Sequence, residues 1–183
     1  MSKLPIFITG NQSKADYLSR HLGVQLEHRK LDLDELQSTD LRVIVEHKLR
    51  QAYGICKVPV LVEDVSLVFL ALGDLPGPYI KWFVDSAGDV ACCRMLDGFD
   101  DRRAVIRCTY GYYDGADMRF FDSESPGSIA TGPRGDNGFG FDRFFIHEGY
   151  AITRSEMSQA ENERTYAEVV KPFKQVREFV RSL

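Results

Sequence analysis

The chain has 183 residues, a length that predicts one domain able to bury a hydrophobic core without disulfide or metal support. Its 23 basic and 27 acidic residues give a net charge of −4, which argues against a nucleic-acid-binding surface. The four cysteines form no Cys-x-x-Cys pair, no apolar run approaches ~20 residues, and the start lacks a secretory signal pattern. These features predict a soluble, cytoplasmic protein with reduced cysteines that binds neither membrane nor nucleic acid.

The first predicted elements are a buried strand over 4–9 and a helix that Ser13 caps and that ends near Leu22. Gly10 and Asn11 separate the two. Lys14 falls in the first turn of this helix, where a cation opposes the helix dipole. Two interpretations stay open: the lysine is solvated, or it accompanies a phosphate bound at the helix start.

A second strand is predicted over 24–31, followed by an acidic loop at 32–35 and by a helix over 40–53. Lys48 falls inside the apolar stripe of that helix. Its ammonium either extends to the edge of the core or points into a cleft that holds an anion, and the sequence favours neither. The stripe recurs at the helical period and consists of Leu41, Ile44, Val45, Leu49 and Ala52.

The segment 59–83 carries several candidate functional groups. Residues 60–62 predict a short buried strand, and Glu63 and Asp64 follow where that strand would emerge. Ligands gather at the carboxyl ends of strands in open α/β sheets, although a solvated strand end explains two carboxylates equally well. A Gly-Asp-Leu-Pro-Gly-Pro turn then leads to Lys81, which lies among the aromatic residues of 79–83.

The rest of the chain predicts a helix over 88–96, antiparallel strands over 104–113 and 118–121, and a short strand over 144–146. Residues 127–140 predict a loop, in which Gly138 and Gly140 allow close approach to a flat ligand. Thr165 and Glu168 match the capping-box pattern of a C-terminal helix. Pro172 divides that helix, whose last part has a buried stripe at Phe173, Val176, Val180 and Leu183.

Four motifs in this order make the chain resemble the inosine triphosphate pyrophosphatase family. They are Thr-Gly-Asn-Gln-Ser-Lys at 9–14, Val-Glu-Asp at 62–64, Leu-Pro-Gly-Pro-Tyr-Ile-Lys-Trp-Phe at 75–83 and Phe-Gly-Phe-Asp at 139–142. The family hydrolyses the triphosphates of non-standard purine nucleosides to a monophosphate and pyrophosphate. The resemblance implies an elongated, two-lobed α/β fold on a long mixed β-sheet with flanking helices. It also implies a nucleotide cleft between the lobes and a homodimer.

The resemblance assigns a role to each matching residue. Asp64 is expected to bind Mg²⁺, or Mn²⁺ in its place, together with Glu35, and to act as the general base. Lys14 and Lys48 are the further expected catalytic residues. The triphosphate is expected at 9–14 and the base pocket at 139–142. In full, the expected substrate-binding residues are Thr9, Gly10, Asn11, Gln12, Ser13, Lys14, Lys48, Asp64, Val65, Lys81, Phe139, Gly140, Phe141 and Asp142.

One part of the chain departs from the family pattern. The family has a lysine and then Ser-His-Arg, which read the keto edge of the purine. This chain has other residues at these four positions, and the nearby Arg164 and Lys171 are candidate substitutes. We therefore expect weaker discrimination of inosine over adenosine triphosphate than in typical family members. The alternative is a nucleotide-binding protein with little turnover, against which the intact metal ligands argue. The residues at the four reader positions are Asn162, Tyr166, Ala167 and Glu168.

Overall fold

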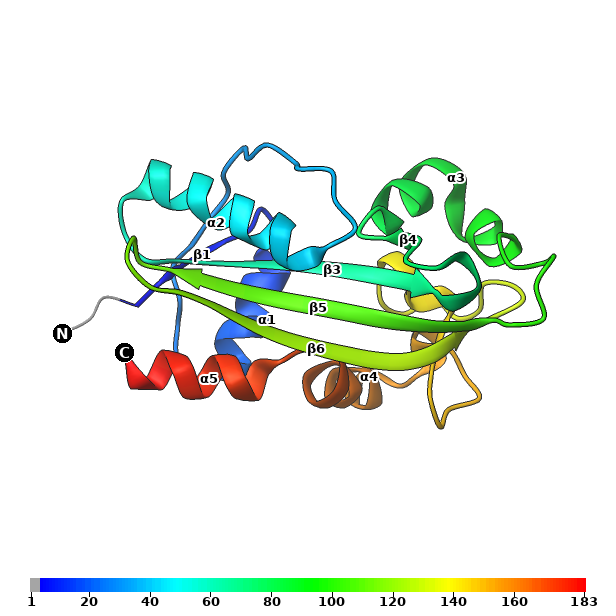
Figure 1. The fold of residues 1–183 in the computed structure, drawn as a ribbon. Helices are drawn as coiled ribbons and strands as arrows, with labels where there is room; N and C mark the ends of the chain where they lie inside the picture. Colours follow the sequence, from blue (N-terminus) through cyan, green and yellow to red (C-terminus); the bar gives the residue numbers. More distant parts are fainter. Residues whose placement is uncertain (1–3) are drawn as a thin grey trace. The chain divides into compact units, whose positions relative to one another are not determined.

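The computed structural model describes residues 4–183, without the side chain of Ser13, as a mixed sheet of seven strands with flanking helices (Figure 1). The strands are β1 (Ile6–Ile8), β2 (His28–Arg29), β3 (Val60–Phe69), β4 (Pro76–Gly77), β5 (Arg103–Tyr113), β6 (Met118–Ile129) and β7 (Phe145–His147). The helices are α1 (Gln12–Leu22), α2 (Leu41–Cys56), α3 (Ile80–Arg94), α4 (Gln159–Thr165) and α5 (Phe173–Ser182). The α/β class expected from the sequence is confirmed.

The sheet has the strand order β2-β1-β3-β5-β6-β7, and β4 pairs with β3. β1 is parallel to both of its neighbours, with Phe7 opposite His28 on β2 and Leu61 on β3. β4 is antiparallel to β3, and β7 is antiparallel to β6. β1 ends at Ile8 whereas β3 continues to Phe69, so β3 extends well past the end of its parallel neighbour.

Contacts along the chain divide it into two compact units. Unit 1 comprises Met1–Asp64, Cys108–Ser123 and Lys171–Leu183, and unit 2 comprises Val65–Arg107 and Glu124–Val170. The residues of β3, β5 and β6 are therefore shared between the two units. The single domain expected from chain length stays a prediction.

In unit 1 the alternation of side chains along β5 decides which helix covers which face of the sheet. Tyr110 and Tyr112 face α5, where their rings lie against Phe173 and Phe179. Gly111 faces α2, and a Cβ atom there would lie 2.4 Å from Val45 Cγ1. The missing side chain therefore lets α2 pack directly on the strand. The five apolar stripe residues expected in α2 are all buried, as the helical period predicted.

Unit 2 has its own hydrophobic core. Leu67 and Phe69 of β3 pack there with residues of α3, including the adjacent Cys92 and Cys93. Phe144 and Phe145 close the same core, and both are fully buried. All four cysteines of the chain are free thiols.

Several predicted boundaries differ from the observed ones in the first half of the chain. Asn11 caps α1 instead of Ser13, because its side-chain oxygen accepts the backbone N–H of Lys14. The predicted strand over 24–31 is reduced to the two residues of β2. The predicted strand over 60–62 is the beginning of the ten-residue β3, so Glu63 and Asp64 lie within a strand and not at its end.

Predicted boundaries in the second half of the chain also differ from the observed ones. α3 starts at Ile80, well before the predicted residue 88, and Gly88 interrupts it with non-helical backbone angles. β6 extends to Ile129, so the predicted glycine-rich loop begins after it. The capping box lies at Ser158 and Glu161 and not at Thr165 and Glu168. α5 begins after Pro172 as predicted, with Phe173, Val176 and Val180 buried and Leu183 only partly so.

Candidate active site

The first group of predicted site residues forms the turn between β1 and α1. The hydroxyl oxygen of Thr9 accepts the backbone N–H of Asn11 at 3.1 Å, and Asn11 Oδ1 accepts that of Lys14 at 3.2 Å. Gly10 and Gln12 are exposed, and the side chain of Ser13 lies outside the described part of the chain. The first turn of α1 contains no acidic residue. Its exposed N–H groups and the helix dipole therefore favour an anion at this position.

Glu63 is a buried carboxylate surrounded by groups of unit 1. Lys171 Nζ donates to its Oε1, the hydroxyl of Tyr110 donates to Oε2 at 2.9 Å, and Lys14 Nζ lies 3.7 Å from Oε1. Burial alone would raise the pKa of Glu63, but the charges of Lys14 and Lys171 and the two hydrogen bonds lower it to about 2. Glu63 is therefore a buried ion-pair partner and not the solvated strand end that the sequence left open.

Lys171 is fixed in unit 1 by this ion pair. Its side chain is 1% exposed, and its ammonium also lies 3.5 Å from the sulfur of Cys108. Burial raises the pKa of the Cys108 thiol to about 12, although the charge of Lys171 acts in the opposite direction. The position of Lys171 in the sequence had suggested a substitute for the missing base reader. The structure instead pairs this buried lysine with Glu63.

Asp64 pairs with Lys48, the residue whose orientation the sequence left undecided. Lys48 Nζ donates to Asp64 Oδ2, and both side chains are mostly buried. Lys48 thus points from α2 to a carboxylate of β3 instead of extending into solvent. Glu35 lies exposed in the loop before α2. In the part of the chain that the structure describes, no group of three or more His, Cys, Asp or Glu side chains converges on one point. The joint metal role of Glu35 and Asp64 stays a prediction.

Two further predicted residues belong to unit 2. Lys81 is exposed in the first turn of α3, followed by the exposed rings of Trp82 and Phe83. Val65 is partly buried against the core of that unit. Their expected contacts with substrate stay predictions, like those of the other carried-over residues.

The expected base-pocket segment forms a compact turn in unit 2. Phe139 presents its ring to solvent with 61% of the residue exposed, and its backbone N–H donates to Asp142 Oδ2 at 3.1 Å. Gly138 has a φ of +81°, and a Cβ atom there would lie 2.3 Å from the same oxygen. The space beside Gly138 is therefore filled by Asp142 and is not open to a flat ligand.

Asp142 forms a buried ion pair that the sequence did not predict. Arg154 NH1 lies 2.9 Å from Asp142 Oδ1, and the two side chains are 4% and 3% exposed. Arg154 also donates from Nε and NH2 to Asn162 Oδ1, at 3.1 and 2.6 Å. Its guanidinium lies over the ring of Tyr166, 4.5 Å from the centroid. Arg154 stands in a Thr-Arg-Ser segment without periodicity, so no local pattern indicated that it is buried.

A second buried polar group lies in the same unit. His147 Nδ1 is 2.9 Å from the hydroxyl oxygen of the fully buried Ser125, and His147 Nε2 has no hydrogen-bond partner within residues 4–183. Burial, assisted by the positive charge of Arg154, lowers the pKa of His147 to about 4. The imidazole is therefore neutral at physiological pH.

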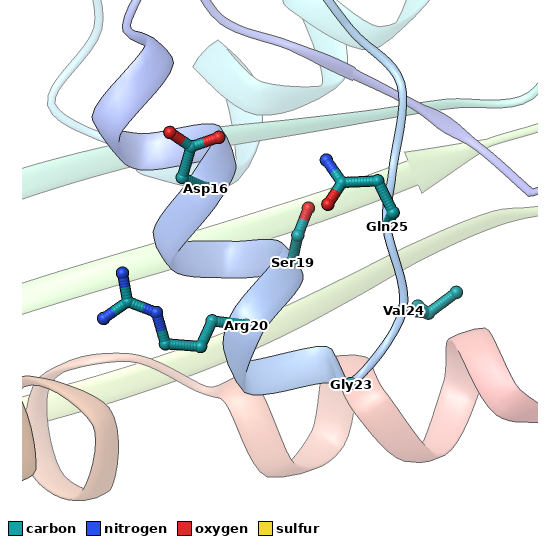
Figure 2. A pocket seen from close by; sticks show the side chains of 6 residues that line it. All are labelled: Asp16, Ser19, Arg20, Gly23, Val24 and Gln25. Atoms are coloured by element: carbon teal, nitrogen blue, oxygen red, sulfur yellow. The ribbon is translucent and has the colours of Figure 1, made fainter.

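Figure 2 shows the residues that line a pocket beside α1 and the loop that follows it. The pocket has a volume of about 470 Å³. Its lining residues are mostly polar and include none of the residues predicted for the site. Ser19, one of them, accepts the backbone N–H of Leu26 at 3.2 Å and so belongs to the structure of unit 1. The full lining is Asp16, Ser19, Arg20, Gly23, Val24 and Gln25.

Comparisons with known proteins give one consistent family. The model of the Ham1 family matches residues 5–170. The chain is 44% identical to an inosine triphosphate pyrophosphatase of Batrachochytrium dendrobatidis over 158 residues, which cover 84% of this chain and 82% of that protein. It is 42% identical to inosine triphosphate pyrophosphatase 2 of Trypanosoma cruzi over 161 residues, 86% of this chain and 82% of that protein. The fold is similar to that of the Staphylococcus aureus Ham1 protein, with a TM-score of 0.83 at 22% identity over 97% and 98% of the two chains.

Proposed function

The chain belongs to the Ham1 family, and on that premise we propose that it hydrolyses non-standard purine nucleoside triphosphates to a nucleoside monophosphate and pyrophosphate. The observation that carries this proposal is the ion pair between Lys48 of α2 and Asp64 of β3. Asp64 lies in the strand next to β1, whose end leads into the turn before α1. The identity of 42–44% to inosine triphosphate pyrophosphatases supports the same reaction.

In the proposed mechanism, unit 1 supplies the groups that act on the triphosphate. The N-terminus of α1 and the ammonium of Lys14 attract the negative charge of the triphosphate. Lys48 neutralises further charge on the phosphate oxygens. Asp64 takes the proton of the attacking water, since an aspartate can serve as a general base when it lies within hydrogen-bond reach of that water. The bond broken joins the α and β phosphates, so pyrophosphate is the leaving group.

We also propose that Mg²⁺, or Mn²⁺ in its place, assists the reaction with Asp64 and Glu35 as protein ligands. Mg²⁺ binds through one or two carboxylates plus substrate phosphates, so a cluster of three carboxylates is not required. Asp64 and Glu35 offer carboxylate oxygens, the ligands that Mg²⁺ prefers, and Lys48 Nζ donates to Oδ2 of Asp64. When bound, the ion would neutralise charge on the phosphate oxygens.

Unit 2 supplies the proposed base-binding groups. The exposed ring of Phe139 offers a stacking surface, and Gly140, Phe141 and Asp142 complete the segment. A homodimer and a cytoplasmic location are further parts of the proposal. The resemblance supports the homodimer, and the free cysteines support the cytoplasmic location. Within the described residues, none of the helices has the length and hydropathy needed to cross a membrane.

Product analysis tests this function. Purified protein with Mg²⁺ is incubated with the triphosphates of inosine, xanthosine, guanosine, adenosine and cytidine, and the products are separated by ion-exchange chromatography. We expect inosine monophosphate and pyrophosphate from the inosine substrate. Asp16→Asn, which removes an exposed carboxylate of α1, serves as the control for Asp64→Asn. Nucleoside diphosphate and single phosphate as main products, or binding without turnover, would overturn the proposal.

A further inference from the structure

Two lysines of unit 1 approach the same carboxylate oxygen of Glu63. Lys171 Nζ donates a hydrogen bond to Oε1, whereas Lys14 Nζ lies 3.7 Å from that oxygen, which is beyond hydrogen-bond distance. The hydroxyl of Tyr110 donates to the other oxygen, Oε2, at 2.9 Å. One carboxylate charge therefore faces two ammonium charges, and the nearer ammonium, that of Lys171, balances it.

The strand register explains why Lys14 reaches this carboxylate. Phe7 of β1 is opposite Leu61 of β3, and β1 ends at the next residue, Ile8. Glu63 is therefore the first residue of β3 beyond the end of β1, where the chain turns into α1. Lys14 lies in the first turn of that helix, and its side chain is 35% exposed. Its ammonium can thus contact either the buried carboxylate or a ligand in solution.

Lys171, in contrast, is confined to the interior of unit 1. Its side chain is 1% exposed, and its ammonium lies 3.5 Å from the sulfur of Cys108 and 5.9 Å from the ring centroid of Tyr110. A buried ammonium is strongly disfavoured without a counter-ion, and Glu63 supplies that counter-ion. The two lysines are therefore unequal partners of the carboxylate: one is fixed in the core and the other is partly exposed.

The neighbouring carboxylate belongs to a separate ion pair. Successive side chains of a strand point to opposite faces of the sheet, so Glu63 and Asp64 lie on opposite faces of β3. Asp64 faces α2 and accepts from Lys48, whereas Glu63 shares its face with Tyr110. A substitution of Lys171 therefore leaves the pair on the α2 face in place.

We propose that Lys171 is a positioning residue: by pairing with Glu63, it keeps the ammonium of Lys14 available for the triphosphate. This inference rests on the proposed function, which places phosphate at the start of α1. Without Lys171, the carboxylate of Glu63 would draw Lys14 into a charge-assisted hydrogen bond and hold it away from the ligand. That bond would have to break before Lys14 could meet phosphate. The buried pair therefore acts on ligand binding through Lys14.

The test is the binding of an inosine triphosphate analogue with a methylene group between the α and β phosphates. Isothermal titration calorimetry in the presence of Mg²⁺ measures its affinity without turnover. We expect Lys171→Met to bind it about 10-fold more weakly than the wild type, because Glu63 then competes with the phosphate for Lys14. Adding Glu63→Gln removes the competing charge and should restore the affinity to within about threefold of the wild type.

A second background separates positioning from a general loss of structure. Lys14→Met removes the ammonium through which Lys171 acts. On this background, Lys171→Met should change the affinity by less than about twofold, because the coupling has lost one of its members. Lys174→Met replaces an exposed lysine of α5 and should keep the affinity of its parent in both backgrounds. Thermal unfolding of every variant shows whether the fold persists at the assay temperature.

Tyr110→Phe gives a milder version of the test if Lys171→Met is unfolded at the assay temperature. It removes the hydroxyl that donates to Glu63 Oε2, so the carboxylate attracts Lys14 more strongly while both buried charges stay in place. The affinity for the analogue should fall by about threefold when Lys14 is present, as expected for the loss of one hydrogen bond to the carboxylate. It should not change on the Lys14→Met background.

The outcomes distinguish this inference from the proposed function. An affinity loss that depends on Lys14 and disappears with Glu63→Gln supports the inference even if inosine triphosphate releases no pyrophosphate, and then the function alone falls. Pyrophosphate release with an equal affinity loss in both backgrounds, or with no loss in Lys171→Met, would overturn the inference alone. A wild-type protein that does not bind the analogue, or a Lys14→Met variant that binds it as tightly as the wild type, would also overturn it.

Discussion

Replacing Lys171 by Met tests whether the buried ion pair with Glu63 is required for stability. The two side chains are 1% and 4% exposed, so removal of the ammonium leaves a buried carboxylate. Glu63 would keep the hydroxyl of Tyr110 at 2.9 Å and the more distant ammonium of Lys14 at 3.7 Å. Breaking a buried pair from one side costs about 3–5 kcal/mol, because the remaining charge loses its compensation.

The pKa of Glu63 gives a second estimate of this magnitude. Its folded value of about 2 lies below the ordinary 4.5, which corresponds to roughly 3 kcal/mol of stability at neutral pH. Because the folded pKa is lowered, this stability is present above pH 4.5 and is lost as the pH falls through 2. Lys14, Lys171 and Tyr110 share the effect. We therefore expect Lys171→Met to lower the free energy of unfolding by about 3 kcal/mol at pH 7.

Urea denaturation of four proteins measures the effect: the wild type, Lys171→Met, Glu63→Gln and the double variant. The double variant should lose less stability than Lys171→Met does, since it leaves no buried carboxylate that has lost its nearest ammonium. The deficit of Lys171→Met should also narrow as the pH is lowered from 7 to 4, because protonation removes the uncompensated charge. Lys174→Met replaces an exposed lysine of α5 and should change stability by less than about 0.5 kcal/mol. A deficit below about 1 kcal/mol for Lys171→Met would refute the reasoning.

Three further predictions concern single side chains. Asp64→Asn should keep the fold and lose activity by about 10²-fold or more, and an unchanged rate at saturating Mg²⁺ would remove Asp64 from the reaction. Lys48→Met should lower kcat, raise KM or both, because Lys48 meets Asp64 and not solvent; an equally active variant would contradict this. The free energy of unfolding should fall by up to about 3 kcal/mol between pH 6.5 and 4, since the unfolded state takes up a proton that buried His147 resists. His147→Gln should remove that pH dependence, and equal slopes for both proteins would exclude His147 as its source.

Local periodicity predicted the fold best where one element packs against one core. The stripe of α2 was correct at every position, because its burial depends only on the helical period. The family resemblance was also confirmed. It could be recognised from the sequence because its motifs are contiguous segments. The caps were less predictable: Ser13 and Thr165 have the chemistry of caps, but Asn11 and Ser158 have it too. The choice among them depends on where the preceding strand or turn ends.

The candidate site was predictable only in its sequence-local parts. Glu63 and Asp64 were both identified, yet their environments differ in a way that adjacent residues cannot reveal. Glu63 pairs with Lys171, which comes 108 positions later in the chain, whereas Asp64 pairs with Lys48, which comes 16 positions earlier. The burial of Arg154 could not be predicted for the same reason, because its partners Asp142 and Asn162 lie in separate elements of the chain. Such contacts are fixed by tertiary packing and leave no period in the sequence.

The ion pair of Glu63 and Lys171 also has a consequence for protein synthesis. The two residues are separated by 108 positions, so at a rate of about 5–20 residues per second the carboxylate emerges roughly 5–20 seconds before the ammonium. Unit 2 ends at Val170 and has all its residues before Lys171 is added. Unit 1 begins first on the ribosome but acquires its last segment only with α5. The nascent chain must therefore hold Glu63 in water until Lys171 has been added.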